Sequence, residues 1–260
     1  MNTLAAPNPT PNTSVPAYAQ GKPYADSFPI IAREGWPLVA LFATISAAAS
    51  TALLTWSPVV GGAVGLLGAL LTGWCIWFFR DPARVIPTEA GAVICPADGV
   101  VVKVEPGVPP AELGLSSAES SGMTKISIFM NVFNVHVNRS PLAGTIRRIA
   151  YTPGAFFNAS FDKASELNER CAYAIDTETR QTIAMVQIAG LVARRIVVKT
   201  REGARLAAGE RYGLIRFGSR VDVYLPRGSR IGVKLGEKTV AGETILASLP
   251  AAAPPTEARR

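Results

Sequence analysis

Histidine and paired cysteines are nearly absent from this sequence of 260 residues. It has a single histidine, His136, so a zinc site built from two or three histidines cannot form. The three cysteines, Cys75, Cys95 and Cys171, include no CxxC pair, which argues against a thiolate metal cluster. Their odd number is typical of a protein from a reducing compartment. We therefore expect no metal ion and no disulfide framework.

Several familiar motifs are missing as well. The sequence has no GxSxG nucleophile elbow and no GxxxxGK[ST] phosphate loop, and it has no convincing dinucleotide fingerprint. It also has no nucleic-acid-binding fingerprint, no sustained heptads and no internal repeat. The formal net charge of +7 is therefore better explained by an anionic membrane surface than by nucleic acid.

Charged residues make up 17% of the chain, and none occurs in the 45 residues from 35 to 79. As one helix this run would extend about 67 Å at about 1.5 Å per residue, roughly twice the ~30 Å hydrocarbon core of a bilayer. The run must therefore fold back once. Trp56-Ser57-Pro58 is the natural break, because proline cannot continue a helix. We predict two membrane-spanning helices, at residues 37–56 and 58–79.

Basic residues flank the predicted hairpin on both sides, and its turn carries no charge. Lys22 and Arg33 precede it, and Arg80 and Arg84 follow it. By the positive-inside bias, we expect both flanks and the domain behind them to face the cytoplasm. We expect the membrane to be the inner (plasma) membrane. Two alternatives stay open: a cleaved signal peptide ending near residues 46–50, and a hairpin buried in a globular core.

The rest of the chain divides into two tails and one domain. Residues 1–28 and 250–260 lack apolar periodicity and are predicted to be flexible tails. Residues 29–80 form the membrane anchor and residues 81–249 the soluble domain. We expect this domain to be mainly β within an α+β class, because short alternating or β-branched runs are separated by Gly and Pro. The predicted strands are residues 92–95, 100–104, 125–130, 135–138, 144–151, 172–177, 182–188, 195–199, 211–215, 220–225 and 230–233.

Two segments of the soluble domain do not follow the strand pattern. Residues 163–170 are predicted to form a short helix. Residues 111–122, rich in Ala, Ser and Gly, are predicted to be a mobile loop, and whether that loop acts as a lid stays open.

The candidate reactive residues each have an ordinary structural explanation. On a strand, His136 would share a face with Asn134 and Asn138 and point toward a polar surface or cleft, but a lone histidine is more often structural. Asp98 lies in Pro96-Ala97-Asp98-Gly99, which is typical of a tight hairpin turn. A turn or bulge would equally explain Gly218-Ser219, which lies between two strand-like runs.

As an ordered set, the motifs carry more weight than they do singly. The chain resembles the short bacterial and archaeal form of phosphatidylserine decarboxylase over residues 36–249. The motifs that carry this resemblance are Phe78-Phe79-Arg80-Asp81-Pro82, Pro96-Ala97-Asp98-Gly99, Asn131 to Pro141, Pro153-Gly154, Asn168-Glu169-Arg170 and Phe217-Gly218-Ser219-Arg220.

The resemblance implies a proenzyme that cuts itself. Cleavage would fall between Gly218 and Ser219 and leave associated chains of residues 1–218 and 219–260. The family's self-cleaving triad maps to Asp98, His136 and Ser219. Longer family members carry a second histidine where this chain has Phe133, so a role of that histidine does not carry over.

The resemblance also implies the cofactor, substrate and reaction. Ser219 would attack the Gly218 carbonyl and convert the amide to an ester. Loss of the Ser219 α-proton would expel that ester and leave dehydroalanine, which would tautomerise and hydrolyse to ammonia and a covalent pyruvoyl group derived from Ser219. That group would form a Schiff base with the amine of phosphatidylserine, and loss of carbon dioxide would yield phosphatidylethanolamine, a step of phospholipid biosynthesis. His136 is the candidate proton donor. The hairpin suits a substrate that does not leave the bilayer readily.

Three other functions and three structural points stay open. The alternatives are a membrane-anchored serine hydrolase that uses Ser219, His136 and Asp98 without self-cleavage, an inactive β-rich scaffold or lipid-binding module, and a pyruvoyl decarboxylase for a soluble amino acid. The last of these leaves the hairpin unexplained. The oligomeric state, including a homo-oligomer, and the extent of processing are open, and so are the residues that hold the phosphate and glycerol. Arg170 is one candidate for the phosphate, although a salt bridge within the fold would explain it equally.

Overall fold

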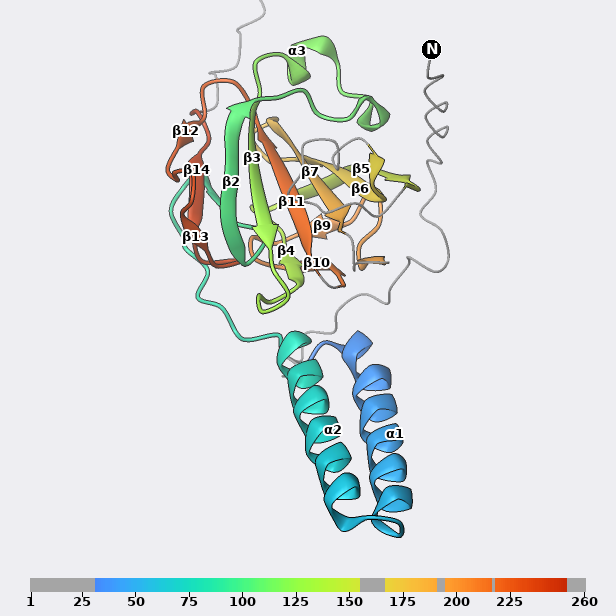
Figure 1. Ribbon diagram of the computed structural model, residues 1–260. Coiled ribbons are helices and arrows are strands. Elements are labelled where there is room, and N and C mark those ends of the chain that lie inside the picture. Colours follow the sequence, from blue (N-terminus) through green and yellow to red (C-terminus); the bar gives the residue numbers. More distant parts are fainter. Residues whose placement is uncertain (1–30, 155–166, 191–194, 217, 252–260) are drawn as a thin grey trace, which may run out of the picture.

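In the computed structural model, two helices project together from one end of a β-rich domain (Figure 1). The structure describes residues 31–154, 167–190, 195–216 and 218–251. The predicted tail at 1–28, nearly all of the tail at 250–260 and the first half of the predicted helix at 163–170 lie outside these residues. At the end of that predicted helix, Arg170 already belongs to a strand.

The helical hairpin agrees with the prediction to within two residues at each end. A 3-10 turn, η1 (Arg33–Gly35), leads into α1 (Trp36–Leu54), and α2 (Pro58–Phe78) returns. At about 1.5 Å per residue, their 19 and 21 residues extend about 28 and 32 Å, which matches the ~30 Å core of a bilayer. Both helices are long and apolar enough to cross a membrane.

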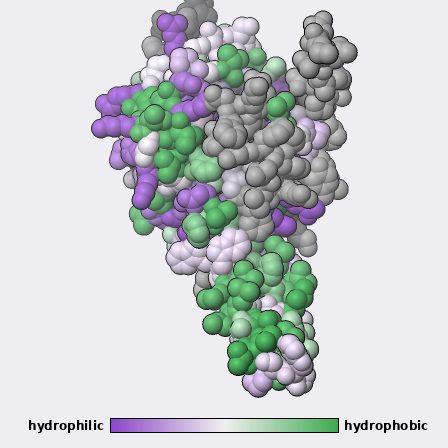
Figure 2. Space-filling model, viewed as in Figure 1, coloured by the Kyte–Doolittle hydropathy of each residue, from purple (hydrophilic) through white to green (hydrophobic). Residues whose placement is uncertain are grey.

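The two helices pack closely because small residues face one another. A Cβ on Gly68 would lie 2.2 Å from the Cβ of Ser46, and the Ser50 hydroxyl donates a 2.8 Å hydrogen bond to the Gly61 carbonyl. Their outer surfaces are exposed and apolar (Figure 2). In the most apolar 18-residue stretch of each helix, only 6% of the residues of α1 and 17% of those of α2 are buried. The hairpin is therefore not the core of a globular domain.

All strand pairs of the domain are antiparallel, and the strands form three sheets among the described residues. The largest sheet has eight strands in the order β13-β2-β3-β11-β7-β6-β5-β9, and two three-stranded sheets have the orders β4-β10-β8 and β1-β14-β12. The mainly β fold predicted from the sequence is thereby confirmed. The strands are β1 (Ala92–Ile94), β2 (Gly99–Pro106), β3 (Thr124–Met130), β4 (Val137–Arg139), β5 (Gly144–Thr152), β6 (Arg170–Asp176), β7 (Thr182–Ala189), β8 (Ile196–Val198), β9 (Arg205–Leu206), β10 (Arg211–Ile215), β11 (Ser219–Leu225), β12 (Arg230–Ile231), β13 (Lys238–Thr239) and β14 (Ile245–Ser248).

Two local predictions are wrong. The residues around Asp98 do not form a hairpin, because β1 pairs with β14 while β2 pairs with β3 and β13, so the bend carries the chain from one sheet to another. Residues 111–122 are not simply a loop, since they contain η2 (Ala111–Leu113) and α3 (Ser117–Ser120). A capping box between Ser116 and Glu119 starts α3.

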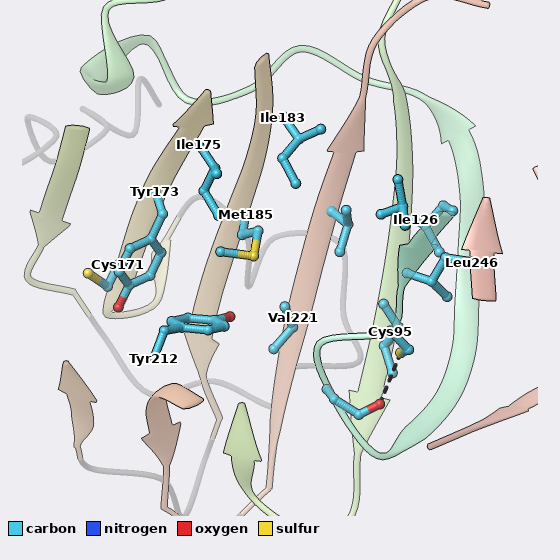
Figure 3. Packing of buried hydrophobic residues seen from close by; sticks show 14 of the residues in the cluster. Cys95, Ile126, Cys171, Tyr173, Ile175, Ile183, Met185, Tyr212, Val221 and Leu246 are labelled. Carbon is cyan, nitrogen blue, oxygen red and sulfur yellow. Dashed lines mark hydrogen bonds between the residues drawn. The ribbon is translucent and has the colours of Figure 1, made fainter. Parts of the chain in front are cut away.

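The main core fills the space on one side of the large sheet. Tyr173, Met185 and Val221 from its strands meet Tyr212 of β10 and Leu246 of β14 (Figure 3). Cys95 and Cys171 belong to this core, and burial raises the pKa of each thiol to about 12. These thiols therefore stay protonated at neutral pH and behave as small apolar side chains.

A second apolar cluster joins the hairpin to the domain. Phe78 and Phe79 at the end of α2 pack with Val137 of β4, Val197 of β8 and Leu214 of β10. In Figure 1, β4 and β10 accordingly lie at the end of the domain nearest the helices. We call the surface formed by these three valine and leucine side chains the hairpin-facing side of the domain.

Candidate functional site

Ser219 is the first residue of β11, a central strand of the large sheet. It pairs with Met130 of β3 on one side and Ala189 of β7 on the other. Because side chains alternate along a strand, Ser219 shares a face with Val221 and therefore points toward the main core. Its hydroxyl is fully buried and has no hydrogen-bond partner among the described residues. The hydroxyls of Ser127, Thr200 and Tyr212 are also buried without a partner among the described residues, so the position of Ser219 after Gly218, which bonds to His136, is what makes it the candidate nucleophile.

Gly218 has a backbone conformation that side-chain-bearing residues rarely adopt. Its φ is +69°, in the left-handed region, although an added Cβ would meet no atom within 4 Å. Its N–H donates a 3.2 Å hydrogen bond to Nε2 of His136. This N–H lies on the N-terminal side of Gly218, so the imidazole is held within one residue of the Gly218–Ser219 bond.

His136 is buried and precedes the strand, so the prediction that it lies on a strand and points toward a polar surface or cleft is wrong. The side chain is 2% exposed, and its ring centroid lies 4.3 Å from that of Phe78 at the end of α2. The expected strand alternation fails because the chain turns before His136. Side-chain oxygens of Asn131 and Asn134 accept hydrogen bonds from nearby backbone N–H groups, and β4 begins only at Val137.

The hydrogen bonds of His136 identify its tautomer. Nε2 accepts from Gly218, and Nδ1 lies 2.9 Å from the Asn134 carbonyl oxygen, so Nδ1 carries the proton. Burial lowers the pKa of His136 to about 4, and the positive charge of Arg80 adds a smaller effect in the same direction. The ring is therefore neutral at pH 7, with the lone pair of Nε2 directed at the Gly218-Ser219 segment.

Asp98 is bonded to other groups than His136. Both of its carboxylate oxygens lie 2.9 Å from Nη2 of Arg84, and Oδ1 also accepts a 2.8 Å bond from the N–H of Ala241. Asp98 precedes β2, and β3 lies between that strand and β11, which Ser219 begins. The structure thus brings His136 to the Gly218-Ser219 segment, while the Asp98 carboxylate is held by Arg84.

The end of α2 and the residues that follow it hold the hairpin to this site. Phe78 covers the His136 ring, and Arg80 donates a 2.9 Å hydrogen bond to the carbonyl of Phe133. The buried Asp81 forms salt bridges with Arg139 at 2.9 Å and Arg211 at 2.5 Å. The sequence analysis used Arg80 to orient the hairpin and noted the stretch as a motif, but it did not predict contacts between the stretch and His136. The available signal was a run of two aromatic and two charged residues at the end of a predicted membrane span.

Two other residues noted in the sequence also have places in the structure. Phe133 is 63% exposed, in the turn whose backbone Arg80 binds. Arg170 forms a 2.6 Å salt bridge with Glu112, which accounts for its charge within the fold.

Buried amides surround the core side of the site. The Tyr173 hydroxyl donates a 2.6 Å bond to Gln187 of β7, and Gln187 donates a 2.8 Å bond to Asn138 of β4. Asn138 in turn reaches the Pro96 carbonyl, just before Asp98. The side chains of Tyr173, Gln187 and Asn138 are thus linked by hydrogen bonds, and these bonds fix the positions of β4 and β7 around Ser219.

These features define the protein as a membrane-associated β domain with a candidate nucleophile and base at the end nearest its apolar helices. The family model described as phosphatidylserine decarboxylase matches residues 71–247. The chain is also 52% identical over 228 residues to a phosphatidylserine decarboxylase proenzyme of Cereibacter sphaeroides (strain ATCC 17025 / ATH 2.4.3), covering 88% of this chain and 92% of that protein. It is 53% identical over 216 residues to a protein with the same description from Ruegeria pomeroyi (strain ATCC 700808 / DSM 15171 / DSS-3), covering 83% of this chain and 94% of that protein. The chain belongs to the phosphatidylserine decarboxylase family.

Proposed function

We propose that this protein is a membrane-anchored carboxy-lyase that converts phosphatidylserine to phosphatidylethanolamine and carbon dioxide. It is made as a proenzyme that cuts itself between Gly218 and Ser219. The observation that carries the proposal is the hydrogen bond from Gly218 to Nε2 of His136, beside a buried Ser219 hydroxyl without a partner, in a member of this family.

The first step of processing follows from the positions of these three residues. Ser219 Oγ forms a bond to the Gly218 carbonyl carbon, the Gly218–Ser219 C–N bond breaks, and the amide becomes an ester. His136 Nε2 takes the hydroxyl proton, for which it exchanges its bond to the Gly218 N–H for one to the hydroxyl, and the proton then passes to the leaving nitrogen. A neutral ring is required, and burial supplies it. The left-handed conformation of Gly218 leaves its carbonyl in an irregular segment rather than in a strand ladder.

Ser219 fits the pyruvoyl group that the family implies, because its hydroxyl is buried and uncommitted. The group supplies a carbonyl that accepts the electron pair released as carbon dioxide leaves. The surrounding residues keep water away from that position. His136 Nε2, whose lone pair faces this segment, takes a proton from the substrate ammonium group and returns it to the substrate α-carbon. The chains of residues 1–218 and 219–260 stay associated, because β11 is hydrogen-bonded to β3 and β7 on both sides.

Asp98 has a different place in this proposal from the one the family triad suggests. Its carboxylate acts as the partner of Arg84, and it attracts the charge of Arg80, which lies near His136. A direct bond to the His136 ring requires the carboxylate to leave Arg84.

The anchor places the site at the membrane surface. Arg33 lies at the start of α1, and Arg80 follows α2, so both charges lie at the end of the hairpin where the domain begins. With two spans, both ends of the hairpin emerge on one side, and the positive-inside bias supports the cytoplasm as that side. The membrane in this proposal is the inner (plasma) membrane. Phosphatidylserine then presents its headgroup to the domain without leaving the bilayer.

Intact mass spectrometry of the purified full chain, with a carbon dioxide assay on phosphatidylserine vesicles, tests the proposal. We expect two fragments divided after residue 218, the smaller of 42 residues (260 − 218) with a ketone-bearing N-terminus. Ser219→Ala should give one uncut chain without decarboxylase activity. A wild-type chain that stays whole while it hydrolyses esters would favour the serine hydrolase instead, and undiminished carbon dioxide release by Ser219→Ala would refute the proposal.

A further inference from the structure

Arg216 lies two residues before the proposed cleavage site, just after the end of β10. Leu214, two positions earlier, packs against the hairpin in the second cluster. Alternation along the strand therefore directs Arg216 to the hairpin-facing side. Gly218, two positions further along, bonds to His136, so the guanidinium is attached close to the reacting segment.

The charge of Arg216 is not neutralised among the described residues. No ion pair of its side chain is formed there, and its Nε is buried without a hydrogen-bond partner. Its cross-strand neighbour is another cation, Arg195, whose carbonyl accepts a 3.2 Å bond from the Arg216 N–H. Like charges opposite one another on paired strands are destabilising.

The acidic group that acts on Arg216 is already engaged. Glu34, in the turn before α1, attracts the Arg216 charge, but it forms a salt bridge with the buried Lys199. One carboxylate therefore faces Lys199 and Arg216 together. Burial lowers the pKa of Arg216, as expected for a cation that lacks an adequate counter-charge. An anion at this position would complete the arrangement.

We infer that Arg216 binds the phosphodiester of the lipid substrate and thereby positions the serine headgroup against residue 219. This inference rests on the proposed function. In phosphatidylserine the phosphorus is joined to the α-carbon through one oxygen and one methylene, so a cation that binds the phosphate must lie near the reacting centre. Arg216 meets this requirement of closeness. It is three residues from Ser219, and because a residue spans at most about 3.6 Å, the backbone of Arg216 cannot lie far from that of Ser219. A planar guanidinium also suits two phosphate oxygens at once.

Two other anions compete for this role, and the experiment must separate them from the lipid. Cleavage would create a carboxylate on Gly218, two residues away, and Arg216 would then serve the cut end rather than the substrate. Free inorganic phosphate is the second. The lipid is favoured because the cation is on the side of the domain that contacts the membrane hairpin.

The test compares two substrates that differ in the phosphate. Dihexanoylphosphatidylserine carries it, and O-octylserine has the same amine, carboxylate and an apolar chain without it. Carbon dioxide release is measured on the full chain in detergent, normalised to the processed fraction, for wild type, Arg216→Gln, Arg216→Lys and Arg230→Gln. The last is a matched control, because Arg230 is exposed on β12, which lies in a different sheet.

We expect Arg216→Gln to raise KM for the phospholipid by about 10- to 150-fold with little change in kcat, the range for one charge-assisted hydrogen bond. It should leave kcat/KM for O-octylserine unchanged. Arg216→Lys should recover part of the loss, and Arg230→Gln should match wild type. Equal losses on both substrates would assign Arg216 to the cut end, and no loss on the phospholipid would remove it from binding. Either result overturns the inference.

A competition experiment needs the wild type alone and therefore holds even if both variants fail to fold. Dihexanoylphosphatidylglycerol should inhibit phosphatidylserine turnover, and dihexanoylglycerol, which lacks the phosphate, should inhibit far less. Equal inhibition by the two, or by inorganic phosphate at the same concentration as the phosphatidylglycerol, would refute recognition of a lipid phosphodiester. A wild type that releases no carbon dioxide from phosphatidylserine would instead refute the proposed function itself.

Discussion

The contact between Phe78 and His136 makes self-cleavage dependent on a residue of the membrane hairpin. Phe78 is fully buried, and its ring lies 4.3 Å from the imidazole. Because burial is the main cause of the lowered pKa of His136, Phe78→Ala should admit water and raise that pKa from about 4 toward the ordinary value near 6.5. The milder Phe78→Leu should raise it less.

The size of the effect follows from the fraction of neutral imidazole. With a pKa of about 4, about 97% of His136 is neutral at pH 5.5, so cleavage of the wild type should run near its maximum rate. With a pKa near 6.5, about 9% would be neutral at that pH. Complete exposure of the ring would therefore reduce the relative rate at pH 5.5 about tenfold, with a smaller reduction for partial exposure.

The assay follows processing of freshly made proenzyme. The chain is synthesised without cells in the presence of vesicles, transferred to buffers from pH 4 to 8, and sampled on a denaturing gel for loss of the full-length band. Each variant is compared with its own rate at pH 8, which removes a uniform loss of active protein. Phe42→Ala is the matched control, because Phe42 is an exposed phenylalanine of α1 and does not belong to the cluster that joins the hairpin to the domain.

The reasoning fails if the midpoint of the pH profile is the same for wild type and Phe78→Ala while both stay folded. It also fails if the wild type loses activity with a midpoint near 6.5, since an exposed imidazole behaves in that way. A shift in Phe42→Ala equal to that in Phe78→Ala would attribute the effect to general loosening of the hairpin.

The remaining predictions concern Asp98 and Gly218. The salt bridge between Asp98 and Arg84 is largely buried, so Asp98→Asn and Arg84→Gln should each lower the free energy of unfolding by about 3 kcal/mol, measured by denaturant titration in nanodiscs. Asp98→Asn should in addition slow self-cleavage, and equal cleavage rates in the two variants would leave Asp98 with a structural role only. Gly218→Ala should slow cleavage about 5- to 30-fold, because a side chain at φ +69° costs about 1–2 kcal/mol. Gly203→Ala, at φ +78° and equally free of close contacts, should show a similar backbone cost without slower cleavage.

The sequence predicts the hairpin and the strand-rich domain well because their signals are local. Absence of charge over residues 35–79 and the proline at position 58 suffice to place both helices. The strand β14 and the two-residue strands β9 and β13 were not predicted. A strand of two residues has no alternation to detect, and its pairing partner lies far away in the chain.

The site is predictable in its residue types but not in its geometry. A turn-forming sequence around Asp98 indicates a local change of direction, whereas the partner of β1 comes from the far end of the chain. The surroundings of His136 depend on a contact with Phe78, 58 positions earlier (136 − 78), which no pattern within Asn134–Asn138 reveals. The roles inferred for Arg84 and Arg216 likewise arise from neighbours that only the folded chain brings near.

The cluster that joins Phe78 and Phe79 to the β domain has a consequence for kinetics. A site fixed to the anchor meets its substrate by lateral diffusion in a two-dimensional sheet, so the relevant concentration is the mole fraction of phosphatidylserine among surrounding lipids. Adding inert lipid at constant total phosphatidylserine should therefore slow turnover, whereas diluting the whole suspension with buffer should leave the rate per enzyme unchanged.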